Sequence, residues 1–285
     1  MNKVLLLGSK GQLGTSFSKI LRQKNLDILD FDLPEFDLLS KIQTEEIISK
    51  YKPDALINCA AYNDVTKAED EIDKVLAING SSLKYLAEFC NEHNTLLCHF
   101  STDYVFDGQT KNPYIESDSR NPKNTYGLSK SMGEDHIQKI CRKFIIIRTA
   151  ALFGRNSCEV NSNIIEKFIQ LGRTHSTLSA VVDEFTSPTF SDNLAVQTLK
   201  IIENNLTGIF HATSEGFCNW FELAEYIFNK MNIKCELIAV SSKEFNKNII
   251  RPAYSVLENK RLKEEKINIM LPWKDAVDKY LKIRE

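Results

Sequence analysis

The sequence predicts an α/β protein with a doubly wound parallel sheet and a smaller carboxyl-terminal α/β region. Short apolar runs alternate with helical patterns through residues 1–150. These runs are continuously hydrophobic, as in parallel strands that are covered on both faces. A glycine-rich turn joins the first apolar run to the first helical pattern. With 285 residues, the chain is long enough to bury a large core.

The composition is that of an ordinary soluble protein. Hydrophobic residues make up 42%, charged residues 26%, and the formal net charge is −2, so we expect neither a nucleic-acid partner nor a membrane surface. The amino terminus enters a strand without an apolar signal core, and we expect a cytoplasmic protein. The seven cysteines are scattered and never spaced as Cys-x-x-Cys, which argues against a disulfide framework or a metal site and for a reducing compartment: Cys59, Cys90, Cys98, Cys141, Cys158, Cys218 and Cys235.

The glycine-rich turn predicts a dinucleotide-binding site. The apolar run Lys3–Leu7 is followed at once by Gly8, Gly11 and Gly14, and then by a helical pattern. A strand, a glycine turn and a helix in this order make the glycine pattern typical of a Rossmann-type sheet. Glycines let the backbone approach a pyrophosphate, whose charge the helix N-terminus stabilises.

Acidic residues end the second predicted strand, which spans residues 26–32. A carboxylate at this point can accept hydrogen bonds from the adenosine ribose and would repel a 2′-phosphate. Asp30 and Asp32 both suit this role, whereas Lys10 in the glycine turn would favour the phosphate. The choice between NADH and NADPH therefore stays open.

Small residues end the third predicted strand, which spans residues 53–61 and follows a helix over 44–50. Ala60 and Ala61 there would let a flat cofactor lie close to the backbone. A long helical region over 69–94 comes next and contains Asn79, a polar residue in a stretch otherwise suited to burial. We expect Asn79 to bridge backbone groups near the site.

The fourth predicted strand, residues 96–101, leads to the residues that suggest catalysis. Thr102 should emerge at its carboxyl end, and Tyr126 and Lys130 lie four residues apart, one turn from each other on one helix face. A neighbouring cation and a helix N-terminus should both lower the pKa of the phenol from about 10. The hydroxyl of Thr102 could then share a carbonyl oxygen with Tyr126.

A fifth strand over 144–148 completes the βα rhythm, which changes after Gly154. The later sequence predicts helices over 161–171, 192–203, 220–231 and 273–283 and strands over 178–182 and 235–239, and Trp220 is expected in the core. We expect a dinucleotide-binding domain formed by residues 1–150 and 182–212. Residues 151–181 and 213–285 would form a substrate-binding region that closes over the ligand.

Together these motifs resemble those of the dTDP-4-dehydrorhamnose reductase family of extended short-chain dehydrogenase/reductases. The resemblance covers nearly the whole chain. Its most specific motif is Ser-Thr-Asp-Tyr-Val-Phe-Asp-Gly at 101–108, and the others are Gly-Gln-Leu-Gly at 11–14, Asn-Cys-Ala-Ala-Tyr at 58–62, Lys-Ala-Glu at 67–69, Tyr-Gly-x-x-Lys at 126–130 with Gly-Glu at 133–134, Arg-Thr at 148–149, Ser-Pro-Thr at 187–189 and Arg-Pro-x-x-Ser at 251–255.

The resemblance implies reduction of the 4-keto group of a dTDP-linked 6-deoxyhexose by NADPH or NADH, to give dTDP-L-rhamnose. The residues leave the oligomeric state open, with a homodimer as one option. The resemblance gives Tyr126 the role of proton donor, Lys130 that of cofactor ligand and activator, and Thr102 that of hydrogen-bond donor to the developing alkoxide. The sugar would contact Thr102, Asp103, Tyr126, Ala151, Arg251 and Ser255. The cofactor would contact Gly8, Gly11, Gln12, Leu13, Gly14, Asp30, Asp32, Asp37, Leu38, Ala60, Ala61, Tyr62, Asn63, Asn79, Phe100, Tyr126 and Lys130.

One departure from the family pattern concerns the sugar. Family members commonly carry a tryptophan where this chain has Ala151. The missing ring leaves a wider pocket, which keeps a different NDP-4-keto-6-deoxyhexose as an alternative substrate. A non-catalytic nucleotide-binding regulatory subunit is a second alternative, and the intact Thr102, Tyr126 and Lys130 argue against it.

Overall fold

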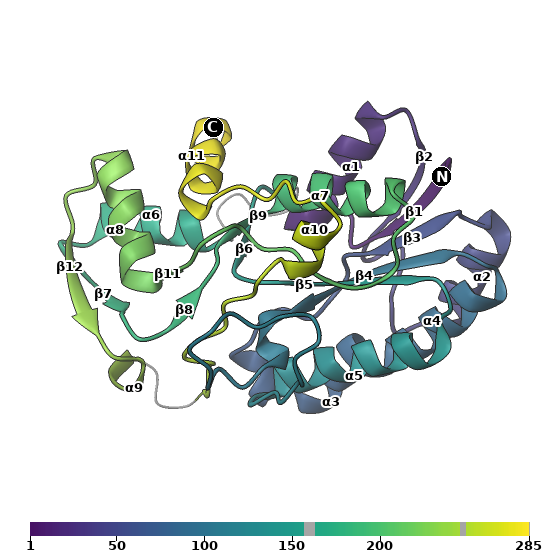
Figure 1. Ribbon diagram of the computed structural model, residues 1–285, viewed down its shortest axis with the longest axis horizontal. Coiled ribbons are helices and arrows are strands. Elements are labelled where there is room, and N and C mark those ends of the chain that lie inside the picture. Colours follow the sequence, from purple (N-terminus) through teal and green to yellow (C-terminus); the bar gives the residue numbers. More distant parts are fainter. Residues whose placement is uncertain (157–162, 246–248, 285) are drawn as a thin grey trace.

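The computed structural model describes residues 1–156, 163–245 and 249–284, and its centre is a six-stranded parallel sheet (Figure 1). The strand order is β10-β5-β4-β3-β1-β2, so the predicted doubly wound parallel sheet is confirmed. The strands are β1 (Lys3–Leu7), β2 (Asp27–Phe31), β3 (Ala55–Asn58), β4 (Leu96–Thr102), β5 (Phe144–Thr149) and β10 (Gly208–His211).

Helices cover both faces of this sheet, because every strand but the edge strand β2 is apolar on both sides (Figure 1). One face packs on α1 (Gln12–Gln23) and α7 (Ser191–Glu203), through Phe17 and Leu194 among others. The opposite face packs on α2 (Lys41–Tyr51), α4 (Ser82–Glu92) and α5 (Thr125–Ile140).

The strand order creates a crevice beside β1. The chain passes from β1 to β2 on one side and returns to β3 on the other. In open α/β sheets, ligands bind outside the carboxyl ends of the strands where the winding direction reverses. Leu7 and Asn58, paired at the ends of β1 and β3, mark this point.

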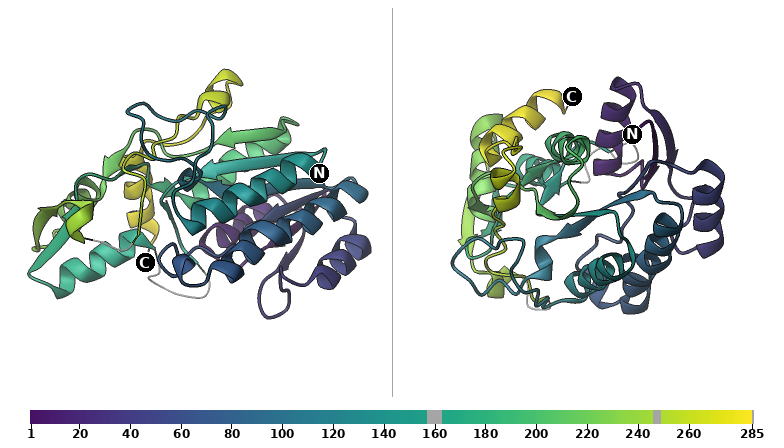
Figure 2. Two further views of the ribbon diagram at one scale, coloured as in Figure 1. Left: turned by 90° about the horizontal axis from the view of Figure 1, so that it is seen from below. Right: turned by 45° about the vertical axis from the view of Figure 1, so that its right-hand side comes forward.

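The later part of the chain forms a smaller region beside one end of the sheet, as Figure 2 shows from two further sides. Its core packs α6, α8 and α11 against short strands. No helix among the described residues is long and apolar enough to cross a membrane. The elements are β6 (Leu152–Phe153), α6 (Ile164–Thr174), β7 (Thr177–Val181), β8 (Phe185–Thr186), β9 (Thr189–Phe190), β11 (Cys218–Asn219), α8 (Trp220–Met231), β12 (Glu236–Val240), α9 (Ser242–Phe245), α10 (Lys260–Glu264) and α11 (Trp273–Ile283).

Several predicted boundaries differ from the observed ones. The helical region expected over 69–94 is divided into η1 (Lys67–Glu69), α3 (Ile72–Leu76), the π-helical turn η2 (Ala77–Ser81) and α4. The π turn contains Asn79, whose side chain hydrogen-bonds the backbone of Tyr62 in both directions, at 2.9 Å each, as we expected. β3 ends at Asn58, so Cys59, Ala60 and Ala61 lie beyond the strand. Asn161, the expected start of a helix, and Cys158 lie outside the described residues.

A buried ion pair fixes α5 to the sheet. Arg148 on β5 donates to Glu134 on α5 through Nε at 2.9 Å and Nη2 at 2.7 Å, and both residues are buried. Ser101 on β4 also donates to Glu134, at 2.6 Å. A buried pair contributes little net stability over an apolar pair, but removal of one partner leaves an uncompensated charge.

We therefore expect Glu134→Ala to lower the free energy of unfolding by about 3–5 kcal/mol, since Arg148 would remain buried without a counter-ion. The matched control is Glu203→Ala, which breaks an exposed pair with Lys24 at 2.7 Å and should cost at most about 1 kcal/mol. Urea unfolding of both variants measures the difference. Equal losses would contradict the assignment of the Arg148 pair as the stronger constraint.

Candidate active site

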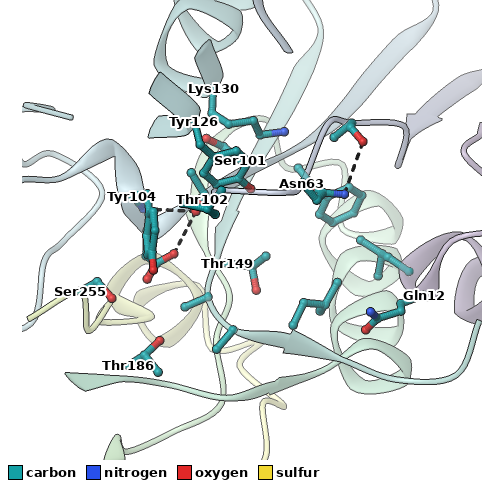
Figure 3. A pocket seen from close by; sticks show the side chains of 18 of the residues that line it. Gln12, Asn63, Ser101, Thr102, Tyr104, Tyr126, Lys130, Thr149, Thr186 and Ser255 are labelled. Atoms are coloured by element: carbon teal, nitrogen blue, oxygen red, sulfur yellow. Dashed lines mark hydrogen bonds between the residues drawn. The ribbon is translucent and has the colours of Figure 1, made fainter. Parts of the chain in front are cut away.

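A cavity of about 460 Å³ lies at the carboxyl ends of the strands. Its walls come from the starts of α1 and α5, from the ends of β3, β4 and β5, and from the later region of the chain. In Figure 3, Tyr126, Lys130, Ser101 and Thr102 lie together, Gln12 lies across the cavity from them, and Thr186 and Ser255 lie at another end. The cavity therefore joins the glycine turn to the carboxyl-terminal region.

Thr102 is positioned by the turn that follows β4. Its hydroxyl accepts a hydrogen bond from the backbone N–H of Tyr104 at 3.2 Å and donates one to Oδ1 of Asp103 at 2.9 Å (Figure 3). The residue is buried, with 5% exposure. Burial raises the pKa of Asp103 to about 6, while hydrogen bonds from Ser255 and Thr102 oppose this shift.

Tyr126 occupies the first turn of α5, which Asn124 caps by accepting from the N–H of Gly127 at 2.8 Å. The ring of Tyr126 stands edge-on to that of Tyr104, with 6.0 Å between centroids. The start of the helix therefore places the phenol beside the end of β4, where Thr102 lies. The sequence-based prediction that these residues share one site agrees with this geometry.

The protonation state of Tyr126 differs from the expectation. Desolvation and the carboxylate of Asp103 raise the pKa of the phenol above its ordinary value, against a weaker opposing effect of the Thr102 hydrogen bond. The prediction that Lys130 and the helix start lower this pKa is therefore wrong for this structure, because desolvation dominates. The phenol is therefore neutral at neutral pH and can donate a hydrogen bond.

Lys130 is buried, with 2% exposure. Burial lowers the pKa of its side chain to about 8, and Glu134 and Cys59 oppose this shift. Nζ of Lys130 lies 3.4 Å from Nε2 of His99 on β4. The catalytic lysine predicted from the sequence thus lies in the cavity wall with an imidazole beside it.

The sequence-predicted sugar ligands line the same cavity: Thr102, Asp103, Tyr126, Ala151, Arg251 and Ser255. The Nε atom of Arg251 is buried without a hydrogen-bond partner among the described residues. Ala151 has a left-handed backbone with φ of 42°, a conformation that is strained for a residue with a Cβ.

The predicted cofactor ligands are divided among three places. Those that line the main cavity are Gly11, Gln12, Leu13, Gly14, Ala60, Ala61, Asn63, Phe100, Tyr126 and Lys130. Asp30 and Asp32 line a second cavity beside the glycine turn, where Asp30 pairs with Arg22 at 2.6 Å and Asp32 accepts from the N–H of Lys10 at 2.7 Å. Those that line neither cavity are Gly8, Asp37, Leu38, Tyr62 and Asn79.

The main cavity is also lined by residues that were not chosen as ligands from the sequence, among them Thr149, Glu184 and Trp220. Trp220 packs against the core of the later region, as expected, and it also lines the cavity, where its indole N–H donates to Glu184 at 3.0 Å. Burial raises the pKa of Glu184. No sequence signal marked Glu184.

Comparison with known proteins agrees with this geometry. The family model "RmlD substrate binding domain" matches residues 1–285. The spore coat polysaccharide biosynthesis protein SpsK of Bacillus subtilis is 32% identical, over 100% of this chain and 98% of its own. A dTDP-4-dehydrorhamnose reductase of Aggregatibacter actinomycetemcomitans is 35% identical over 81% of this chain and 79% of its own. The dTDP-4-dehydrorhamnose reductase of Bacillus anthracis, solved with NADP, superimposes with a TM-score of 0.94 at 32% identity and 99% coverage of both chains.

The fold, the cavity and these matches lead to one conclusion. The chain belongs to the dTDP-4-dehydrorhamnose reductase family of extended short-chain dehydrogenase/reductases.

Proposed function

We propose that this protein reduces the 4-keto group of dTDP-4-dehydro-L-rhamnose to give dTDP-L-rhamnose, with NADPH or NADH as reductant. The observation that carries the proposal is the convergence of Thr102, Tyr126 and Lys130 on one cavity that also reaches the glycine turn. The family membership supports the same reaction. The protein is thus an oxidoreductase of nucleotide-sugar biosynthesis.

A reduced nicotinamide supplies the hydride for such a reaction. The chain would supply the proton, from the neutral phenol of Tyr126 to the carbonyl oxygen of the sugar. The hydroxyl of Thr102 would exchange its hydrogen bond to Asp103 for one to the same oxygen as negative charge develops there. This lowers the barrier because the interaction strengthens in the transition state. Lys130 would hold the cofactor beside Tyr126.

We propose that the two parts of the chain divide the ligands. Residues 1–150 and 182–212 would hold the cofactor, which is supported by the pairing of β10 with β5 and the packing of α7 against α1. Residues 151–181 and 213–285 would hold the sugar nucleotide. Arg251 suits the pyrophosphate, since its orphaned Nε needs an acceptor.

A cytoplasmic location and a homodimer belong to the same proposal. The location is supported by the cysteines, which are free throughout the described residues. The homodimer is supported by two exposed apolar side chains on the packed helices α3 and α5, Ile72 and Leu128.

The glycine turn fits a dinucleotide. The first turn of α1 carries no acidic residue and no side-chain cap, so its backbone N–H groups are available to a phosphate. Oε1 of Gln12 is buried without a partner among the described residues. A Cβ on Gly14 would lie 2.0 Å from the carbonyl oxygen of Gly8, whereas one on Gly11 would meet nothing closer than 3.5 Å. Gly14 is therefore required for the turn itself, and Gly11 only for close approach of a ligand.

These two glycines give a matched pair of variants. We expect Gly14→Ala to lower the free energy of unfolding of the apoprotein by about 1–3 kcal/mol, because the new methyl group overlaps Gly8. Gly11→Ala should leave it nearly unchanged and weaken NADPH binding. Denaturant unfolding and cofactor titration measure the two effects. Unchanged NADPH affinity in Gly11→Ala would contradict the placement of the pyrophosphate at this turn.

The proton donor is tested by Tyr126→Phe. We expect kcat to fall by about 10²–10⁴-fold, because general acid catalysis is lost, and the Kd of NADPH to stay nearly unchanged. Tyr104→Phe is the matched control, since it removes a phenolic hydroxyl from the same cavity. It should lower kcat by at most about tenfold. A normal kcat in Tyr126→Phe would eliminate the mechanism.

The absence of a large side chain at Ala151, which lines the cavity, favours the alternative substrate, another NDP-4-keto-6-deoxyhexose. Ala151→Trp should lower KM if the sugar is dTDP-4-dehydrorhamnose, because the ring would fill the space beside it. Ala151→Gly is the control for the left-handed backbone and should stabilise the fold by about 1 kcal/mol. Loss of activity in Ala151→Trp alone would indicate a bulkier or differently oriented sugar.

The reaction itself is tested by oxidation of NADPH and NADH with enzymatically generated dTDP-4-dehydrorhamnose, with the product identified by NMR. We expect turnover to dTDP-L-rhamnose. Turnover only with a different 4-keto sugar would show that the proposed substrate is wrong and identify that sugar in its place. Cofactor binding without turnover of any such sugar would favour the regulatory role.

A further inference from the structure

A buried imidazole lies between the catalytic lysine and an amide side chain. His99 on β4 is 1% exposed, as is Asn58 at the end of β3. Nδ1 of His99 lies 3.2 Å from Nδ2 of Asn58, and Nε2 of His99 lies 3.4 Å from Nζ of Lys130. The three side chains therefore form one continuous buried row from β3 across β4 to α5.

The orientation of the Asn58 amide determines the tautomer of His99. The backbone N–H of Ala60 donates to Oδ1 of Asn58 at 3.1 Å, so the amide nitrogen, which is only a donor, must face His99. Burial and the nearby Lys130 lower the pKa of His99 well below its usual range, so the ring is neutral. Nδ1 therefore accepts from Asn58, and the single ring proton lies on Nε2.

This tautomer directs an N–H donor toward Lys130. An ammonium group carries donors only, whereas a neutral amine has one lone pair that can accept. Lys130 forms no salt bridge among the described residues, because the oxygens of Glu134 are occupied by Arg148, Ser101 and Arg120. The titratable groups that face Lys130 are His99 on β4, Glu134 on its own helix and Cys59 after β3. The network of hydrogen bonds is complete only when Nζ is neutral.

We propose that Asn58 and His99 are positioning residues that direct an N–H donor at Nζ of Lys130, and so hold this lysine as a group able to change between amine and ammonium rather than as a permanent cation. The inference rests on the proposed function only for the catalytic role of Lys130. Burial lowers the pKa of Lys130 in the same direction, to about 8, against the opposing effects of Glu134 and Cys59. A lysine that titrates in this range can give up a proton and take one back during turnover.

The tautomer can be measured on the apoprotein by NMR of ¹⁵N-labelled histidine, with His99 assigned from the signal that His99→Phe removes. We expect Nδ1 of His99 to resonate as an unprotonated ring nitrogen and Nε2 as a protonated one. The reverse pattern in the unmodified protein would overturn the proposal. This measurement needs no substrate, so its outcome is independent of whether the reductase reaction occurs.

Asn58→Asp is the matched variant. A carboxylate of the same shape can still accept from the N–H of Ala60, but it has no N–H to donate to His99 and must accept from it instead. We expect the ring proton to move to Nδ1, leaving Nε2 to accept from a lysine ammonium. The Lys130 signal, followed with ¹³C-labelled lysine and assigned by Lys130→Met, should titrate near pH 8 in the unmodified protein. It should shift toward about 10.4, the ordinary lysine value, in the variant. An ordinary lysine titration in the unmodified protein would contradict the proposal even if Asn58→Asp does not fold.

Discussion

The site depends on polar side chains of α5 that are buried against the sheet. Lys130 and Glu134 lie one turn apart on the inner face of this helix, and their partners, His99, Ser101 and Arg148, lie on β4 and β5. Charges removed from water are tolerated only where partners satisfy them, so the helix can pack on the sheet in one register. That register places Tyr126, at the start of α5, beside the carboxyl end of β4.

Burial also determines the chemistry of the cavity. It raises the pKa of Tyr126, lowers that of Lys130 to about 8 and raises that of Asp103 to about 6. All three shifts favour the uncharged forms. A neutral phenol could donate to an oxygen that becomes negative, which suits the proposed reduction of a ketone.

Sequence patterns predicted the sheet, the glycine turn and the pair of Tyr126 and Lys130, because each of these depends on residues close together in the chain. Apolar runs specify parallel strands, and the glycine turn and the Tyr126 and Lys130 pair are each contained in a few residues. Glu184 and Trp220 were not predicted to line the cavity, because their place there depends on how the later region packs beside the end of the sheet. The raised pKa of Tyr126 depends on burial, and the tautomer of His99 depends on the orientation of the Asn58 amide. Neither can be derived from the spacing of residues in the sequence.

The central claim is that desolvation keeps the phenol of Tyr126 protonated, so that it can donate a proton. The most direct test is a spectrophotometric titration of phenolate in the unmodified apoprotein. The same titration of Tyr126→Phe is subtracted, so that the difference reports Tyr126 alone. The account predicts no phenolate from Tyr126 up to at least about pH 10, the ordinary tyrosine value. Appearance of its phenolate near neutral pH would contradict the account and restore a lysine-activated tyrosine.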